Sequence, residues 1–306
     1  PFSSNVPEEA WKDEGWHASE KKDGVSVLAT LSPQGVGIVS RRKSGEEEPV
    51  AKDDHVPHIR DLKVPAKYHG MVVRGELYHP KEGYNVVSGL LNSDPVKAVQ
   101  TQKALGKLKL DAFNVVKLPG GKPADEVPFQ EKWKLLQDLV RDVAATSFGV
   151  PNSTTESRSE FFKDVVSKGG EGVVLTRLDA TGDHTQFRAK KYQDHNLKVV
   201  GVTPGSGKWS GKGVGALILA DATGRVVSKA GSGLDQAQRE DAHKNPRNWI
   251  GKIVRIRAME PTADSLRQPH FLGMSDSPKP DKVDLRGDKA IYDSLRGAGV
   301  PSEKQK

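Results

Sequence analysis

The chain has 306 residues, of which 35% are hydrophobic and 28% charged. At roughly 150 residues per domain, this length predicts about two domains, each large enough to bury a core. The sequence contains no cysteine, which excludes disulfide scaffolds, thiolate zinc sites and cysteine nucleophiles. No apolar run approaches the roughly 20 residues of a membrane-spanning helix, and residues 1–15 show no secretory signal. We therefore expect a globular protein that does not contact a membrane.

Positive charge is concentrated in the last third of the chain. Residues 1–195 carry 28 Lys and Arg against 28 Asp and Glu, whereas residues 196–306 carry 19 against 12. The net charge of +7 thus comes from the C-terminal part. This asymmetry favours a C-terminal module that binds a polyanion, because Lys and Arg that contact phosphates release condensed counterions. A solvated basic surface is the alternative.

The first two thirds of the chain predict a mixed α/β domain. Runs rich in Val, Leu and aromatic residues predict strands at residues 25–31, 71–78, 111–116 and 172–178. One predicted helix begins at Pro95 behind the cap residue Asp94 and stops before Gly106. Another carries a buried apolar stripe, formed by Phe129, Trp133, Leu136, Val140 and Val143. A third includes residues 161–166 and ends at the glycine pair 169–170.

After Asp194 the pattern changes to short strands separated by glycine-rich turns. Strands are expected at residues 197–203, 214–220, 225–230 and 252–259, with one helix at 234–243. This pattern predicts a small five-stranded barrel of the type that binds oligonucleotides. From residue 278 onward, Pro, Lys and Asp predict a flexible basic tail with one short helix around 289–296. The predicted parts are therefore a domain at 1–195, a barrel domain at 196–277 and a tail at 278–306.

Four short strings in a fixed order carry candidate reactive residues. They are KKDG at 21–24, VRGEL at 73–77, GEGVV at 170–174 and FRAKK at 187–191. A Lys-x-Asp-Gly string alone occurs by chance in about one chain of this length in ten. The ordered set is far more specific than this string alone.

Together these strings resemble the nucleotidyltransferase motifs of ATP-dependent DNA ligases in their minimal, two-domain viral or phage-like form. The resemblance covers nearly the whole chain: the strings SR at 40–41, AFN at 112–114, GSGL at 231–234 and SLRQPHF at 265–271 are also similar to ligase segments. It implies an α+β fold, with a nucleotidyltransferase (adenylation) domain followed by a small OB-fold β-barrel domain. The activity it implies is sealing of nicks in duplex DNA, as in DNA repair, replication and recombination.

The resemblance also assigns roles in the chemistry. Lys21 would attack the α-phosphate of ATP to give a lysyl-adenylate, with Arg188 and Lys190 as catalytic cations. Neighbouring positive charge disfavours the ammonium form of a lysine and neutralises charge on a phosphoryl group in transfer. Glu171 and Glu76 would hold Mg²⁺, or Mn²⁺ in its place, because Mg²⁺ prefers one or two carboxylates together with phosphate oxygens.

Further roles follow from the same resemblance. Glu20 would read the purine edge, Phe113 would stack on adenine, Glu76 would also contact the ribose, and Arg41 would hold the ribose or a nick phosphate. Contacts to DNA are expected from Arg42, Lys208, Lys212, Arg255, Arg257 and Arg267. We expect a monomer in the cytoplasm, or in the host cytoplasm if the protein is viral. Lys22 and Lys191 are expected to be solvated neighbours, since surface exposure is usual for lysine.

The chain departs from the family pattern at two positions. Ser26 stands where the lysine motif usually has an arginine, and Asn114 stands where an acidic residue usually follows the aromatic. These departures favour one alternative, a non-catalytic nucleic-acid-binding relative with a decayed domain. An RNA ligase of the same superfamily and an mRNA-capping guanylyltransferase, which shares the lysine motif, are further alternatives. Because Lys21 and Glu171 are retained, the sequence favours an active enzyme.

Overall fold

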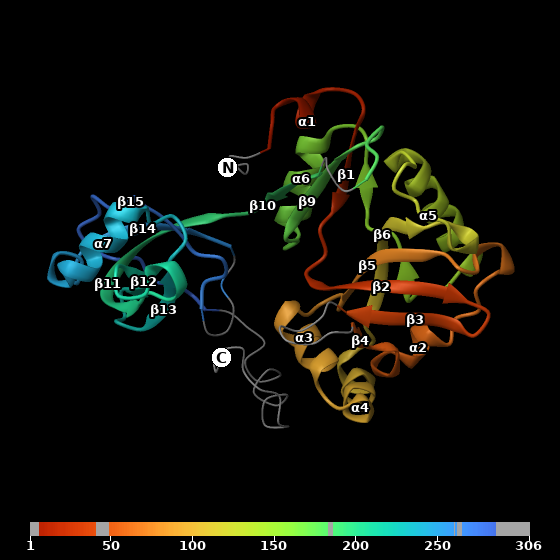
Figure 1. Ribbon diagram of the computed structural model, residues 1–306, viewed down its shortest axis with the longest axis horizontal. Helices are drawn as coiled ribbons and strands as arrows, with labels where there is room; N and C mark the ends of the chain where they lie inside the picture. Colours follow the sequence, from red (N-terminus) through yellow and green to blue (C-terminus); the bar gives the residue numbers. More distant parts are fainter. Residues whose placement is uncertain (1–5, 41–48, 183–185, 260, 262–264, 286–306) are drawn as a thin grey trace. The chain divides into compact units, whose positions relative to one another are not determined.

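Two units make up the computed structural model, and the chain passes from one to the other between Lys190 and Lys191 (Figure 1). The structure describes residues 6–40, 49–182, 186–259, 261 and 265–285. Within these, the N-terminal unit contains residues up to 190 and the C-terminal unit begins at 191. The position at which the sequence divided the two domains, after residue 195, falls inside strand β11 (Gln193–Pro204).

A four-stranded and a six-stranded sheet form the N-terminal unit. The four-stranded sheet is antiparallel, with the order β10 (Gln186–Lys190), β9 (Gly172–Arg177), β1 (Trp16–Glu20) and β8 (Ser153–Thr154). The six-stranded sheet has the order β4 (Val50–Ala51), β3 (Gly35–Ser40), β2 (Gly24–Ser32), β5 (Val72–Tyr78), β6 (Lys109–Lys117) and β7 (Phe148–Gly149). Its pairs are antiparallel except that β6 and β7 run parallel.

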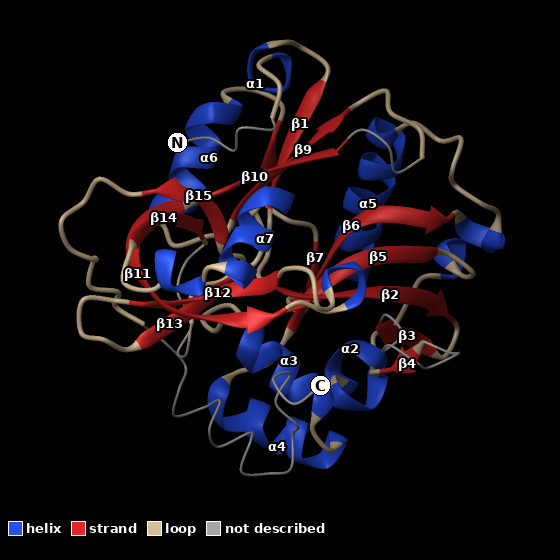
Figure 2. Ribbon diagram, turned by 60° about the vertical axis from the view of Figure 1, so that its left-hand side comes forward, coloured by secondary structure: helices blue, strands red, loops and turns tan. Residues whose placement is uncertain are grey.

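Helices surround these sheets. The α-helices of this unit are α1 (Glu9–Lys12), α2 (Pro57–Arg60), α3 (Tyr84–Asn92), α4 (Pro95–Leu105), α5 (Phe129–Val143) and α6 (Arg158–Ser167). Short 3₁₀ turns are η1 (Asp53–His55), η2 (Ala66–Tyr68) and η3 (Pro119–Gly121). Helix α5 packs on β6, and α6 packs on β1 and β9, as Figure 2 also shows.

Helix ends and buried faces follow the sequence signals. The side chain of Asp94 accepts a hydrogen bond from the backbone of Lys97, so it caps α4 as predicted, and Gly106 ends the helix with a φ of 113°. Along α5, Phe129, Trp133 and Leu136 are buried in the larger hydrophobic cluster, with the two valines of the stripe packed against it. A smaller cluster lies between α6 and the four-stranded sheet.

The C-terminal unit is a five-stranded antiparallel sheet that curls toward a barrel. Its order is β13 (Val226–Ala230), β12 (Val214–Ala220), β11, β14 (Ile253–Ala258) and β15 (His270–Met274). A parallel bridge between Ser232 and His270 connects the segment after β13 to the opposite edge strand, β15. Helix α7 (Gln236–Lys244) starts with a capping box formed by Asp235 and Gln238, and two 3₁₀ turns complete the unit, η4 (Gly207–Trp209) and η5 (Pro246–Asn248).

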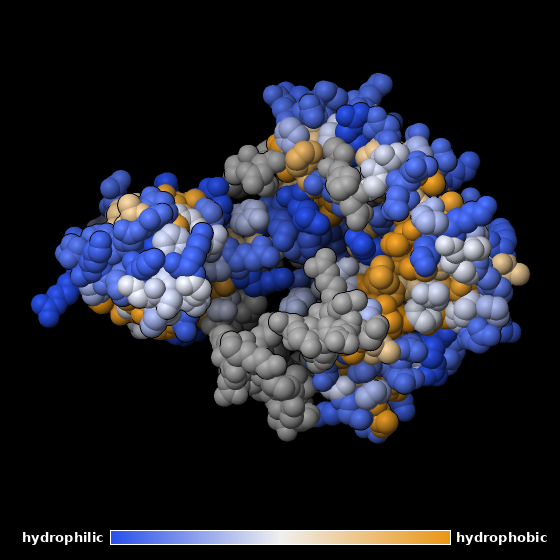
Figure 3. All heavy atoms as spheres, in the orientation of Figure 1, coloured by the Kyte–Doolittle hydropathy of each residue, from blue (hydrophilic) through white to orange (hydrophobic). Residues whose placement is uncertain are grey.

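The predicted fold class, an α+β nucleotidyltransferase-type domain followed by an OB-type barrel, is confirmed. The four strands and the helix expected in the barrel are present, and the fifth strand, β15, was not among those predicted. Figure 3 shows the hydrophilic side chains that cover α7, consistent with a helix in which only Ala242 is buried among the described residues.

The expectation of a flexible tail from residue 278 is wrong for residues 278–285. Val283 is buried in the barrel core, and Arg225 donates a hydrogen bond from Nη2 to its carbonyl at 2.7 Å. The backbone N–H of Asp281 donates to the carbonyl of Asn196 at 2.7 Å, and its carboxylate accepts from the N–H of that residue. Composition indicated disorder here because it does not register a single apolar anchor. The helix predicted at 289–296 lies outside the described residues.

Candidate active site

Strand pairing in the N-terminal unit brings Lys21, Glu171 and Lys190 together. Strand β1 ends at Glu20, and the backbone N–H of Lys21 donates to the carbonyl of Gly172 at 2.9 Å. Gly172 also pairs with Lys190 across β9 and β10. A Cβ at Gly172, whose φ is 145°, would lie 2.0 Å from the carbonyl oxygen of Ala189, so this close approach of strands requires glycine.

A single carboxylate joins the two lysines. Lys21 Nζ lies 2.6 Å from Glu171 Oε2, and Lys190 Nζ lies 3.1 Å from Glu171 Oε1. The Glu171 side chain is only 5% exposed, whereas Lys21 is 22% and Lys190 11% exposed. Charge-assisted hydrogen bonds of this kind fix side chains more firmly than solvated pairs do. The group carries two positive charges and one negative, so it attracts an anion to the side chain of Lys21.

Structural contacts explain why the KKDG string has an aspartate at position 23 and a glycine at position 24. The carboxylate of Asp23 accepts a hydrogen bond from the backbone N–H of Tyr84 at 3.1 Å, at the first residue of α3. A Cβ at Gly24 would lie 2.0 Å from the carbonyl oxygen of Leu77, because β2 and β5 approach closely there. These contacts anchor the loop that carries Lys21.

Glu76 lies on the face of the six-stranded sheet that is turned away from its core. In β5, Val73, Gly75 and Leu77 are buried, while Glu76 alternates with them and pairs with Ser26 across β2. Burial raises the pKa of Glu76 to about 7, and the negative charges of Glu171 and Asp23 raise it as well. Positive charge from Lys21 and a backbone hydrogen bond from Gly24 act in the opposite direction.

This electrostatic environment fits a divalent cation. The negative charge of Glu171 disfavours ionisation of Glu76 and so raises its pKa, and a cation between carboxylates relieves such repulsion. No group of three or more His, Cys, Asp or Glu in the described ranges has the arrangement of a metal site. Two carboxylates are nevertheless sufficient for Mg²⁺, which keeps water and phosphate oxygens as its other ligands.

Phe113 occupies a β-bulge in β6. Gly75 pairs with Ala112 and Arg74 with Asn114, so Phe113 is the additional residue of the bulge. A bulge redirects the side chain of the inserted residue. Phe113 is half-buried, and none of the three hydrophobic clusters found among the described residues includes it. Stacking of Phe113 on adenine stays a prediction.

Lys22 is not the solvated neighbour that the sequence predicted. Its side chain is 15% exposed, and Nζ lies 2.7 Å from Glu20 Oε2 and 3.8 Å from Asp111 Oδ2. The ammonium group also lies 4.9 Å from the ring centroid of Tyr78. Glu20 accepts a second hydrogen bond, from Asn152 Nδ2 at 3.0 Å. The sequence missed this group because its members come from residues 20 to 152, and no local pattern links them.

The structure does not join three other predicted residues to the group of Lys21, Glu171 and Lys190. Arg188 lies on the same face of β10 as Lys190, two residues away, and its side chain is exposed. No ion pair of Arg188 is found within the described ranges, so the structure does not join it to Glu171. Arg41 and Arg42 fall outside the described residues.

The predicted DNA contacts of the C-terminal unit differ in exposure. Lys208 and Lys212 are exposed in the turn between β11 and β12, where Lys208 also contacts the Trp209 ring. Arg255 is exposed on β14, whereas Arg257 on the same strand forms two hydrogen bonds with Asp194, at 2.8 and 3.1 Å. Arg267 is half-buried.

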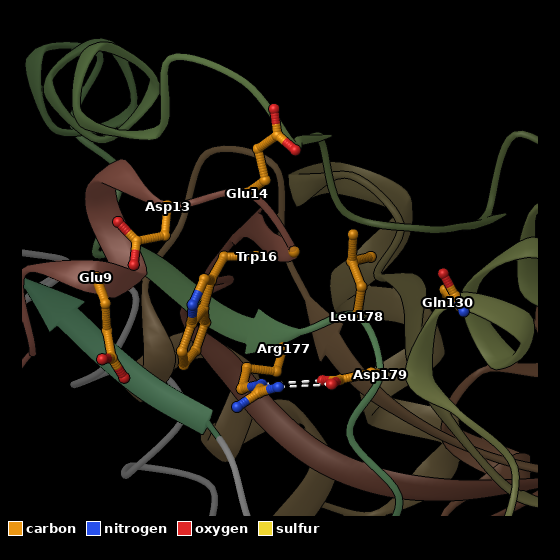
Figure 4. Close-up of a pocket in the computed structure, with 9 residues that line it drawn as sticks. Glu9, Asp13, Glu14, Trp16, Gln130, Arg177, Leu178 and Asp179 are labelled. Carbon is orange, nitrogen blue, oxygen red and sulfur yellow. Dashed lines mark hydrogen bonds and ion pairs between the residues drawn. The ribbon is translucent and has the colours of Figure 1, made fainter.

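A separate pocket of the N-terminal unit contains none of the predicted site residues (Figure 4). It is lined by Glu9, Asp13, Glu14, Gly15, Trp16, Gln130, Arg177, Leu178 and Asp179. Figure 4 shows the ion pair between Arg177 and Asp179 at its edge. Four carboxylates make this pocket a poor place for a triphosphate, so we do not assign nucleotide binding to it.

Comparison with known proteins shows a similarity in the C-terminal unit. Residues 204–274 match the family described as DNA ligase OB-like domain. The fold and this match confirm the resemblance to minimal ATP-dependent DNA ligases that the sequence shows. No curated protein matches the chain.

Solved structures show the same fold at low sequence identity. One from work on Lig E DNA ligases is 19% identical, with a TM-score of 0.62, and the match covers 86% of this chain and 93% of that one. Pmar-Lig_PreS3 is 20% identical with a TM-score of 0.67, and Pmar-Lig_Pre is 21% identical with a TM-score of 0.66. Each of these two matches covers 87% of this chain, but only 65% and 64% of the other chains.

None of the helices in the described ranges is long and apolar enough to cross a bilayer.

Proposed function

We propose that the protein is an ATP-dependent DNA ligase that seals nicks in duplex DNA through a lysyl-AMP intermediate and a DNA-adenylate. The observation that carries this proposal is the group formed by Lys21, Glu171 and Lys190, with Nζ–O distances of 2.6 and 3.1 Å. It holds a primary amine on one oxygen of a buried carboxylate whose other oxygen holds a second cation, inside a fold shared with DNA ligases.

In the first step, the neutral amine of Lys21 forms a bond to the α-phosphorus of ATP, and the nitrogen gives up one proton to solvent. The bond from that phosphorus to the bridging oxygen breaks, and pyrophosphate leaves with the electron pair. Lys190, held by Glu171, would offset charge on the phosphoryl oxygens. Glu76 and Glu171 would hold Mg²⁺, which supplies Lewis-acid stabilisation of phosphate charge when bound.

The next two steps use the same pocket. An oxygen of the 5′-phosphate at a nick attacks the AMP phosphorus, the phosphorus–nitrogen bond breaks, and the Lys21 nitrogen regains a proton. The 3′-hydroxyl then attacks the activated 5′-phosphate, loses its proton and releases AMP. Phe113 would stack on adenine from its bulge, and the exposed cations of the C-terminal unit would contact DNA phosphates.

Incubation with ATP and Mg²⁺ tests the first step directly. Intact mass spectrometry should show a gain of one AMP per chain, and Lys21→Ala should abolish the adduct. Lys117→Ala, on an exposed lysine of β6, is the matched control and should react like the wild type. Full labelling of Lys21→Ala would contradict the assignment of the nucleophile.

Sealing of defined nicks tests the rest of the proposal. Duplexes with DNA or RNA on each side of the nick should be joined best when both strands are DNA. A requirement for RNA at the 3′-OH end would indicate an RNA ligase, and labelling by GTP but not ATP would indicate a capping-type guanylyltransferase. If no nucleotide gives an adduct, the chain is a non-catalytic relative.

A further inference from the structure

Lys22, next to the proposed nucleophile, is held in a cage of two carboxylates and one aromatic ring. Its Nζ lies 2.7 Å from Glu20 Oε2, 3.8 Å from Asp111 Oδ2 and 4.9 Å from the ring centroid of Tyr78. The side chain is 15% exposed. Lysine is rarely buried to this extent without charged partners, and an ammonium over an aromatic face gains further attraction. Lys22 therefore has a fixed position.

Two donors orient the carboxylate of Glu20. Lys22 Nζ and Asn152 Nδ2 both reach the same oxygen, Oε2, at 2.7 and 3.0 Å. The backbone N–H of Glu20 also donates to the carbonyl of Asn152 at 2.8 Å. Within the described part of the chain, no donor reaches Oε1. One oxygen of the carboxylate is thus paired, and the other is an open acceptor.

The opposite side of the cage ties Lys22 to the strands that carry Glu76 and Phe113. Tyr78 ends β5 and Asp111 lies in β6, where it pairs with Glu76 across the two strands. Asp111 is buried, and burial raises its pKa. Because β5 and β6 are central strands of the sheet, they give the cage a rigid base.

We propose that Lys22 and Asn152 are positioning residues that select adenine over guanine by presenting Oε1 of Glu20 to the base. Adenine carries an amino group that donates a hydrogen bond at the position where guanine carries an acceptor oxygen. A carboxylate oxygen locked in place accepts from the adenine amino group and meets only another acceptor in guanine. Sites with a fixed polar partner reject the mismatched analogue because a buried group is left unpaired. The inference rests on the proposed function and extends it to base selection.

Equilibrium binding to the full chain tests this inference without the covalent step. The probes are the α,β-methylene analogues of ATP, of GTP and of the nucleotide whose purine lacks the 6-amino group, each titrated by calorimetry. The variants are Lys22→Met, which keeps length but removes the donor, Lys22→Arg, which keeps the charge, and Asn152→Leu. Lys117→Met is the matched control on the exposed lysine of β6.

The preference of the wild type for the adenine analogue over the guanine analogue should fall about tenfold in Lys22→Met, the loss of one hydrogen bond to a charged group. Lys22→Arg should retain most of the preference. Asn152→Leu should lower it about threefold, a smaller change because Asn152 is exposed. Affinity for the analogue without the amino group should change less than about twofold in every variant, since that base makes no use of Oε1.

An unchanged adenine-to-guanine ratio in Lys22→Met, or equal weakening of all three analogues, would overturn the inference. If the wild type forms the AMP adduct while this ratio stays unchanged, the proposed function stands and only the inference fails. If the wild type binds none of the three analogues, both fail.

Discussion

The two units of this chain hold their charged side chains in opposite ways. In the N-terminal unit, Lys21 and Lys190 are 22% and 11% exposed and share one carboxylate that is almost fully buried. In the C-terminal unit, Lys208, Lys212 and Arg255 are exposed.

The difference reflects two tasks of charge. A reacting amine must be held within a narrow range of positions, so its partners are buried and hydrogen bonded. Binding of a polyanion needs cations that can contact phosphates and release the condensed counterions, and exposed side chains meet that need. Removal of a charge in the N-terminal unit should therefore strongly change the rate of adduct formation or the free energy of unfolding. Removal of a charge in the C-terminal unit should change DNA affinity by a small, salt-dependent amount.

The largest effect is expected for Glu171→Gln. Loss of the charge that holds both lysines should lower the rate of AMP-adduct formation by about 10³-fold, a size typical of removing a preorganised electrostatic partner. Single-turnover labelling with ATP measures the rate, and circular dichroism checks the fold. Glu156→Gln, at an exposed position of the same unit, is the control. A rate for Glu171→Gln within threefold of the wild type would show that the shared carboxylate is not needed.

The next effect concerns Glu76, whose pKa of about 7 in the folded chain lies above its ordinary value of 4.5. Between pH 4.5 and about 7, Glu76 keeps its proton in the folded chain and releases it in the unfolded chain. The stability that Glu76 contributes is therefore fully present below about pH 4.5 and lost as pH rises through about 7. Relative to Glu76→Gln, the wild type should lose about 3 kcal/mol of unfolding free energy between pH 4.5 and 8.

Urea unfolding of both proteins at the two pH values, without divalent cations, measures this difference. Glu131→Gln, on the exposed face of α5, should change the unfolding free energy equally at both pH values. If the unfolding free energies of the wild type and Glu76→Gln changed equally with pH, that result would contradict the burial of an uncompensated charge at this position.

The smallest effect separates two arginines of one strand. Arg255→Ala should weaken binding of nicked duplex about fivefold and reduce the slope of log affinity against log salt by about one. Arg257→Ala should change affinity about twofold or less, because its guanidinium is already paired with Asp194. Fluorescence anisotropy over a series of salt concentrations gives both quantities. Equal losses for the two variants would argue against the idea that exposure decides which cation contacts DNA.

Local signals predicted much of the fold. The N-cap at Asp94, the stop at Gly106 and the buried stripe of α5 depend on neighbours three or four residues away, and all three are confirmed. Strand β12 has the predicted bounds, 214–220. Strand β1 was missed because its sequence, WHASE, mixes apolar and polar residues, and its stability comes from pairing with β8 and β9 far along the chain.

The candidate site was predictable only in part. Lys21, Glu171 and Lys190 were named from motif strings, and the structure places them in contact. The same strings gave no reason to join Lys22 to Asp111, because that contact depends on the register of strands that are distant in sequence.

The sequence by itself determined the fold class, the order of the reactive residues and the basic character of the C-terminal part, since periodicity, motif order and charge are properties of the linear chain. Only the tertiary structure decided that Lys22 is caged, that Glu20 is held by Asn152, and that Val283 anchors residues that composition assigned to a tail. The physical reason is the same in each case: burial and hydrogen bonding depend on which distant segments meet, and no local window of sequence contains that information.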